Sequence, residues 1–144
     1  MFLTQSSQRK KSFTEKEYNA LSQKIIQCCM EVHKELGPGL MESVYEVCAE
    51  SVMKKAGLIV QRQILLPVIF KGEKLNKEFV IDMLVNDLII VEFKSLEILL
   101  PVHEAQLVTY LKLADKKLGL LINFNVTLLK DGIKRKINGN LNSV

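Results

Sequence analysis

Three charged residues lie in the middle of the most apolar stretch of the chain. Asp82 ends the run Phe79-Val80-Ile81-Asp82, and ten residues later the chain reads Ile90-Val91-Glu92-Phe93-Lys94. A buried carboxylate is costly unless it is paired or binds a metal, and two neighbouring carboxylates repel each other unless a cation lies between them. The sequence therefore predicts a divalent-metal site with a lysine beside it.

The two apolar runs predict an antiparallel hairpin. Residues 80–85 and 88–93 are rich in Val, Ile, Leu and Met, and Asn86-Asp87 between them is typical of a turn. Side chains alternate between the faces of a strand, so Glu92 and Lys94 point the same way.

The register of this hairpin decides whether Asp82 joins them. A two-residue loop places Asp82 opposite Val91, whereas a three-residue loop through Leu88, or a bulge, places it opposite Glu92. A slip of one residue moves every side chain to the other face. We expect the second register, because it gathers all three charged groups on one face.

Composition indicates a single globular domain. The chain has 144 residues, of which 48% are hydrophobic and 25% charged, enough for a core of its own. We expect this domain over residues 13–138, between short tails at 1–12 and 139–144. No apolar run is long enough to span a membrane, and the start lacks the order of a secretion signal, so we expect a cytoplasmic location.

Charge and cysteine usage constrain the function only weakly. The net charge of +4 permits contact with a polyanion without requiring it. Three cysteines fall inside helical patterns at no metal-ligand spacing and are expected to be reduced core residues: Cys28, Cys29 and Cys48. The sequence carries no signal for the oligomeric state.

Apolar periodicity predicts three helices, over about residues 14–36, 40–56 and 101–113. Thr14 and Glu17 form a capping box at the start of the first helix, and Pro101 fits the first turn of the third.

Strands are expected on both sides of the third helix. One covers residues 58–70 and precedes the hairpin described above, and another covers 118–124, where consecutive apolar residues indicate burial on both faces. A last hairpin is expected from residues 127–130 and 133–137 around the turn Asp131-Gly132. The predicted order is helix, helix, three strands, helix, then two or three strands.

The second predicted helix adds carboxylates. Glu42, Glu46 and Glu50 are four residues apart and form one row on the helix surface, which is usually a solvated face. Glu50 fits that interpretation, but Glu42 or Glu46 could reach the carboxylates of the sheet. In the third helix, Gln106 and Tyr110 are also four apart, and by themselves they indicate only an ordinary polar face.

Residues 39–46, Gly-Leu-Met-Glu-Ser-Val-Tyr-Glu, fit the pattern GxxExxY, and the chain resembles the small family of bacterial proteins named after it. The resemblance covers roughly residues 20–137 and continues through further motifs in the same order: Asp82, Glu92-Phe93-Lys94, residues 101–106, Tyr110-Leu111 and residues 119–124. That family looks like a branch of the PD-(D/E)XK nuclease superfamily. The resemblance implies an α/β fold with a restriction-endonuclease-like core, a mixed sheet flanked by helices in the order αβββαβ, preceded here by an extra helix.

The resemblance also implies roles for residues. It implies metal-dependent hydrolysis of phosphodiesters, with an acidic set of Glu46, Asp82 and Glu92, and with Glu42 close by as the alternative helical ligand. The resemblance implies that Lys94 is the catalytic lysine.

Two further positions bear on the resemblance. The spacing Gln106-x-x-x-Tyr110 is similar to a motif that recombination and phage exonucleases of this superfamily carry after their lysine. The proline that often precedes the aspartate is Ile81 here, at a position that varies in the superfamily.

The chemistry follows from the residues as well. Mg²⁺ held by carboxylates, or Mn²⁺ in its place, lowers the pKa of a bound water and neutralises the phosphate. Lys94 would orient the attacking water or stabilise negative charge, and Gln106 and Tyr110 would hydrogen-bond the water, the lysine or the phosphate. Of the aromatic residues, Tyr45 and Tyr110 are expected to face the site.

Two hypotheses follow. The first is a Mg²⁺-dependent nuclease that acts on DNA rather than RNA, and the second is a non-catalytic module that keeps the fold and binds nucleic acid or a protein partner. A simple buried ion pair is disfavoured, because one lysine cannot neutralise two carboxylates and the helix glutamates.

Overall fold

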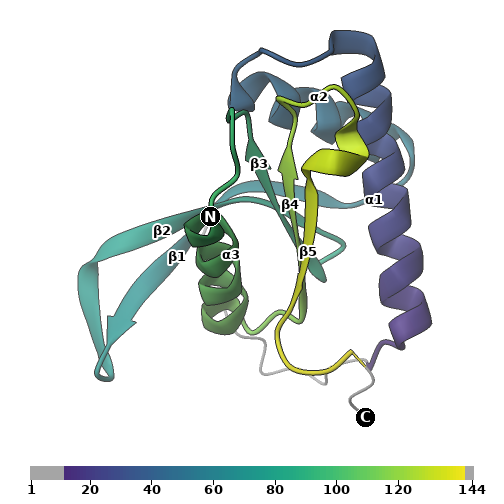
Figure 1. Ribbon diagram of the computed structural model, residues 1–144. Coiled ribbons are helices and arrows are strands. Elements are labelled where there is room, and N and C mark those ends of the chain that lie inside the picture. Colours follow the sequence, from purple (N-terminus) through teal and green to yellow (C-terminus); the bar gives the residue numbers. More distant parts are fainter. Residues whose placement is uncertain (1–11, 142–144) are drawn as a thin grey trace.

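The computed structural model describes residues 12–141 and shows one mixed sheet with helices on both faces (Figure 1). The helices are α1 (Glu15–Leu36), α2 (Glu42–Lys55), α3 (Pro101–Ala114) and the short 3₁₀ helix η1 (Leu129–Gly132). The strands are β1 (Val60–Phe70), β2 (Glu73–Val85), β3 (Ile89–Lys94), β4 (Leu118–Asn123) and β5 (Ile133–Ile137).

The five strands lie in the sheet in chain order, from β1 to β5. β3 and β4 are parallel, and the other neighbours are antiparallel. The parallel pair needs a crossover, which α3 supplies. After α1, the elements from α2 to β4 follow the order αβββαβ, so the predicted α/β class with an extra N-terminal helix is confirmed.

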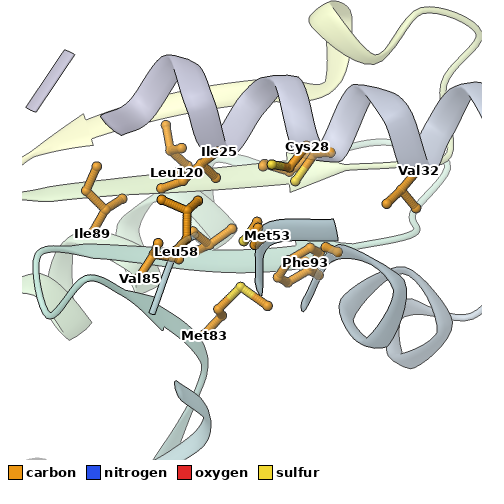
Figure 2. Close-up of a cluster of buried hydrophobic side chains, with 14 of the residues drawn as sticks. Ile25, Cys28, Val32, Met53, Leu58, Met83, Val85, Ile89, Phe93 and Leu120 are labelled. Atoms are coloured by element: carbon orange, nitrogen blue, oxygen red, sulfur yellow. The ribbon is translucent and has the colours of Figure 1, made fainter. Parts of the chain in front are cut away.

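The larger core lies between the sheet and the helices α1 and α2 (Figure 2). Alternate residues of β3, namely Ile89, Val91 and Phe93, point into it. Cys28 and Cys29 are buried there as free thiols, and Cys48 packs against its edge, as predicted. This packing fixes the position of α2 against β3 and β1.

A smaller core lies under α3 on the opposite face. Ile90 and Leu121 from the sheet contact Leu107 and Leu111 of α3. Gly119 of β4 permits this close approach, because a Cβ at that position would lie 2.8 Å from Leu107. The two faces of the sheet are therefore both covered, as the continuous apolar run of β4 predicts.

The predicted strand at residues 127–130 is wrong. That segment leads into η1, and β5 pairs with β4 instead, from Ile122↔Ile133 to Leu118↔Ile137. Leu129 is buried in the larger core, so its apolar character serves packing and not strand pairing. Gly132 ends η1 against the carbonyl of Asn123, where a Cβ would lie 2.1 Å from the oxygen.

Most of the two expected tails lies outside the described residues. Within the expected C-terminal tail, Leu141 is buried in the larger core. None of the helices in residues 12–141 has the length and apolar character needed to cross a membrane.

Candidate metal centre and active site

The β2–β3 hairpin brings Asp82 and Glu92 together. Its ladder pairs Met83 with Val91 and Val85 with Ile89, which corresponds to a three-residue loop. Asn86 and Asp87 adopt left-handed conformations, with φ of 51° and 57°, as tight hairpin turns require. One step beyond the ladder, Asp82 stands opposite Glu92, so the predicted register is confirmed.

Each of these two carboxylates is held by the backbone of the opposite strand. The N–H of Asp82 donates to Oε2 of Glu92 over 3.1 Å, and the N–H of Phe93 donates to Oδ2 of Asp82 over 2.9 Å. These bonds continue the hairpin beyond Met83 and Val91 with side chains in place of carbonyl groups. The geometry of the pair is therefore fixed by the sheet.

Glu92 is 6% exposed, and its environment disfavours a negative charge. Burial raises the pKa of Glu92 well above its usual value, and a hydrogen bond to the Asp82 carboxyl group and the Asp82 charge raise it further. The backbone N–H of Asp82 and the charge of Lys94 act in the opposite direction. A cation between the two carboxylates would relieve this repulsion.

Glu46 approaches from α2 and is 4% exposed. Its carboxylate accepts hydrogen bonds from Nε of Arg62 at 2.8 Å and from Nε2 of Gln63 at 3.0 and 3.1 Å. Burial raises the pKa of Glu46, the Gln63 and Arg62 hydrogen bonds lower it, and the charge of Asp82 raises it. Glu46 is thus near enough to Asp82 for the two charges to repel.

An open cavity of about 760 Å³ connects these groups to solvent. Its lining includes Glu42, Glu46, Asp82, Arg62 and Gln63. Glu92 is buried beside Asp82 and is not part of this lining. Substrate entering the cavity would therefore meet Asp82 and the α2 glutamates first.

Lys94 and Tyr110 complete the group around the carboxylate pair. Lys94 is two residues from Glu92 on β3, half-buried, and near enough to lower the pKa of Glu92. Tyr110 is 7% exposed, and burial raises its pKa, with further increases from Glu92 and Asp82. Gln106, one turn earlier on α3, is exposed, and within residues 12–141 no hydrogen bond joins it to the carboxylates.

The expectation that Tyr45 faces the site is wrong. Its side chain is fully buried and stacks on Phe124, with ring centroids 4.4 Å apart. The hydroxyl donates to the carbonyl of Gly37 at 2.6 Å and accepts from the N–H of Leu40 at 3.1 Å. Tyr45 therefore fixes the loop between α1 and α2, one wall of the cavity.

Sequence reasoning missed Arg62 and Gln63. The signal for them is a run of three polar residues, Gln61-Arg62-Gln63, near the start of the otherwise apolar strand β1. It also missed Asn123, which is 3% exposed. The amide of Asn123 accepts from the N–H and donates to the carbonyl of Leu96, both at 2.9 Å, and so holds the chain that follows Lys94.

The donor set fits a small divalent cation. No group of three or more His, Cys, Asp or Glu side chains within residues 12–141 is arranged as a complete metal site. Asp82 and Glu92 nevertheless form a close pair of oxygen donors, and Mg²⁺ commonly binds to one or two carboxylates while keeping several waters.

A family model of the PD-(D/E)XK nuclease superfamily matches residues 19–136. The chain belongs to the PD-(D/E)XK nuclease superfamily. Members of this superfamily are typically nucleases, generally use divalent metals and act on nucleic acid. The match spans all seven predicted site residues, from Glu42 to Tyr110. Neither the search of curated proteins nor that of solved structures found a match.

Proposed function

We propose that the protein is a Mg²⁺-dependent nuclease that hydrolyses phosphodiester bonds of DNA. The observation that carries the proposal is the fixed Asp82 and Glu92 pair beside Lys94, at the edge of an open cavity. A buried carboxylate with a raised pKa beside a cleft, as Glu92 is, is a common feature of active sites.

In this proposal Asp82 and Glu92 hold the cation, and either Glu46 or Glu42 supplies a third oxygen from α2. Mg²⁺, or Mn²⁺ in its place, would supply charge neutralisation and a more acidic bound water. Backbone N–H groups already hold the carboxylates of Asp82 and Glu92 beside each other, which supports this assignment.

The remaining residues act on the water and the phosphate. Lys94 stands on the same face of β3 as Glu92, where its ammonium can orient the attacking water and stabilise charge on the phosphate. Tyr110 can hydrogen-bond the water or the lysine from the α3 side, and Gln106 can hydrogen-bond substrate phosphate from its exposed position.

The motif at residues 39–46 supports assignment to the GxxExxY branch of the superfamily. In this chain its tyrosine holds a cavity wall and its last glutamate lines the cavity. We further propose a cytoplasmic location and a single domain over residues 13–138. The free thiols of Cys28, Cys29 and Cys48 support a reducing compartment.

A non-catalytic module is the second candidate. One observation favours it: the carboxylate of Glu46 is already bound by Arg62 and Gln63, which compete with a metal ion for its oxygens. Such a protein would use the cavity to bind nucleic acid or a protein partner without cleaving it.

The decisive experiment incubates the purified protein with mixed single- and double-stranded DNA and RNA, with Mg²⁺ or Mn²⁺. We expect cleavage of DNA that a chelator stops and that Asp82→Asn abolishes. Binding without cleavage of every substrate would favour the non-catalytic module, and cleavage that survives Asp82→Asn would contradict the assigned site.

A further inference from the structure

Strand β1 has an irregular backbone at Gln63, in addition to a register shift between Pro67 and Ile69. Arg62 pairs with Met83 and Ile64 with Ile81, which leaves Gln63 opposite Asp82. Gln63 has φ of 52°, in the left-handed region that residues other than glycine rarely occupy. Such a conformation costs free energy and persists only where surrounding contacts impose it.

At Gln63 the side chains of the β1–β2 hairpin switch from one face of the sheet to the other. Met83 belongs to the larger core under α1 and α2, whereas Ile64 and Ile81 belong to the smaller core under α3. Regular alternation would direct Arg62 and Gln63 to opposite faces of the sheet. Because of the left-handed residue, both side chains instead reach the same carboxylate, that of Glu46.

The two oxygens of Glu46 are used unequally. Oε2 accepts from Nε of Arg62 at 2.8 Å and from Gln63 at 3.0 Å, and pairs with NH2 of Arg62 at 2.8 Å. Among the described residues, Oε1 accepts only the longer bond from Gln63, at 3.1 Å. A carboxylate oxygen has two lone pairs, so Oε2 is saturated while Oε1 can still bind another partner.

Charge compensation explains Arg62 but not Gln63. Arg62 compensates the charge of buried Glu46 and is itself held by Glu50 at 3.5 Å. Gln63 is neutral and exposed, so it adds no charge compensation, yet its backbone carries the strain. Both residues line the cavity together with Glu46 and Asp82.

We infer that Gln63 is a positioning residue which, with Arg62, turns Glu46 so that Oε1 is available as the third oxygen ligand of the metal site. The inference rests on the proposed function. It selects Glu46 over Glu42 as the helical ligand. Outer hydrogen-bond partners of ligating carboxylates orient the ligand, and their loss commonly weakens metal binding about 10–100-fold.

The test replaces Gln63 with glycine and measures Mn²⁺ binding by calorimetry on the full chain. Glycine adopts a positive φ without strain but lacks the amide. A matched control is Lys71→Gly at the far tip of the β1–β2 hairpin, where φ is 51° and the residue lies away from the carboxylates (Figure 1).

Without metal we expect Lys71→Gly to melt at or above the wild-type temperature, because it removes backbone strain. Gln63→Gly should melt near the wild-type temperature, because the relief of strain offsets the loss of two hydrogen bonds to Glu46. Only Gln63→Gly should weaken Mn²⁺ binding, about 10–100-fold. In a Glu46→Gln background, Gln63→Gly should have little further effect, because the two residues act through the same oxygen. Gln63→Asn, which tolerates the left-handed backbone but carries a shorter amide, should also weaken binding.

The outcomes separate this inference from the proposed function. If wild type binds Mn²⁺ and both Gln63 variants bind it equally well, Gln63 does not position a ligand and the inference is overturned. If wild type shows no Mn²⁺ binding, the proposed function fails, and the inference fails with it. If Gln63→Gly melts below the wild-type temperature, the Mn²⁺ affinity of Gln63→Asn decides whether Gln63 positions a ligand: weaker binding supports the inference, and wild-type binding overturns it.

Discussion

Asp82 donates its backbone N–H to Oε2 of Glu92 across the β2–β3 hairpin, over 3.1 Å. The reciprocal bond, from the N–H of Phe93 to Oδ2 of Asp82, is 2.9 Å long. Two groups that repel each other when ionised are thus held side by side by the strands that carry them. The repulsion lowers the stability of the folded protein unless a proton or a cation binds to the pair. The stability therefore depends on pH and on divalent cations, and both effects can be measured.

The metal-free protein should lose stability as the pH rises above about 4.5, the ordinary pKa of glutamate. Because the pKa of Glu92 is raised on folding, the folded state holds the proton more tightly than the unfolded chain does. This stabilisation is complete below the unfolded pKa and is lost as the pH rises through the folded pKa. Urea unfolding between pH 5 and pH 8 with a chelator measures it.

Glu92→Gln should flatten that pH dependence and stabilise the metal-free protein at neutral pH. A suitable control is Glu104→Gln, because Lys136 lowers the pKa of Glu104 and the sign of its contribution is opposite. The control should therefore keep the downward trend. An unchanged trend in Glu92→Gln would show that Glu92 is not the group responsible.

Divalent cations should raise the melting temperature of the wild type. A cation that binds only the folded form stabilises it by about 2.7 kcal/mol at a concentration of 100 Kd. Asp82→Asn should remove most of the rise, because it removes one of the paired charges. Thermal melts with Mg²⁺, Mn²⁺ and chelator test this, and a melt that is indifferent to both cations would count against the metal site.

Arg62→Met should destabilise the protein, because it leaves the buried Glu46 carboxylate without its cation. Breaking a buried pair costs about 3–5 kcal/mol, and the 27% exposure of Arg62 places the expected loss near the lower end. Glu46→Gln in the same chain should restore much of the loss. Lys54→Met, which breaks an exposed pair with Glu50, should change stability by less than about 1 kcal/mol.

The β2–β3 hairpin shows what local sequence can predict. Its turn and its alternation are decided within about a dozen residues and leave two registers open. The expectation that the three charged residues share one face selects the register that is observed, with Asp82 opposite Glu92. The helix α1 is similar, since Thr14 and Glu17 form the predicted capping box. Signals of this kind act between neighbours in the chain.

The contacts of Glu46 show where such prediction ends. They come from residues 16 and 17 positions away and depend on the left-handed backbone of Gln63, which no local preference of glutamine indicates. The strand prediction for residues 127–130 was wrong for a related reason. Their composition suits a strand, but β5 takes the place beside β4 and Leu129 is drawn into the core.

Lys94 offers the sharpest separation of chemistry from binding. If its ammonium acts on the water or the phosphate, Lys94→Ala should lower cleavage by about a hundredfold or more while Mn²⁺ binding stays near the wild-type value. The carboxylates that bind the cation are untouched by this change. Glu92→Gln should differ, because it weakens both cation binding and cleavage.

Lys94→Arg should not restore activity, because a guanidinium is bulkier than an ammonium and cannot release its proton near neutral pH. Lys112→Ala, on the exposed surface of α3, is the matched control and should cleave as the wild type does. The comparison requires a cleavage assay that a chelator silences, together with calorimetry on each variant. Equal cleavage by wild type and Lys94→Ala would place the chemistry at a different site. Lys94 would then serve only to balance the charge of the carboxylates beside it.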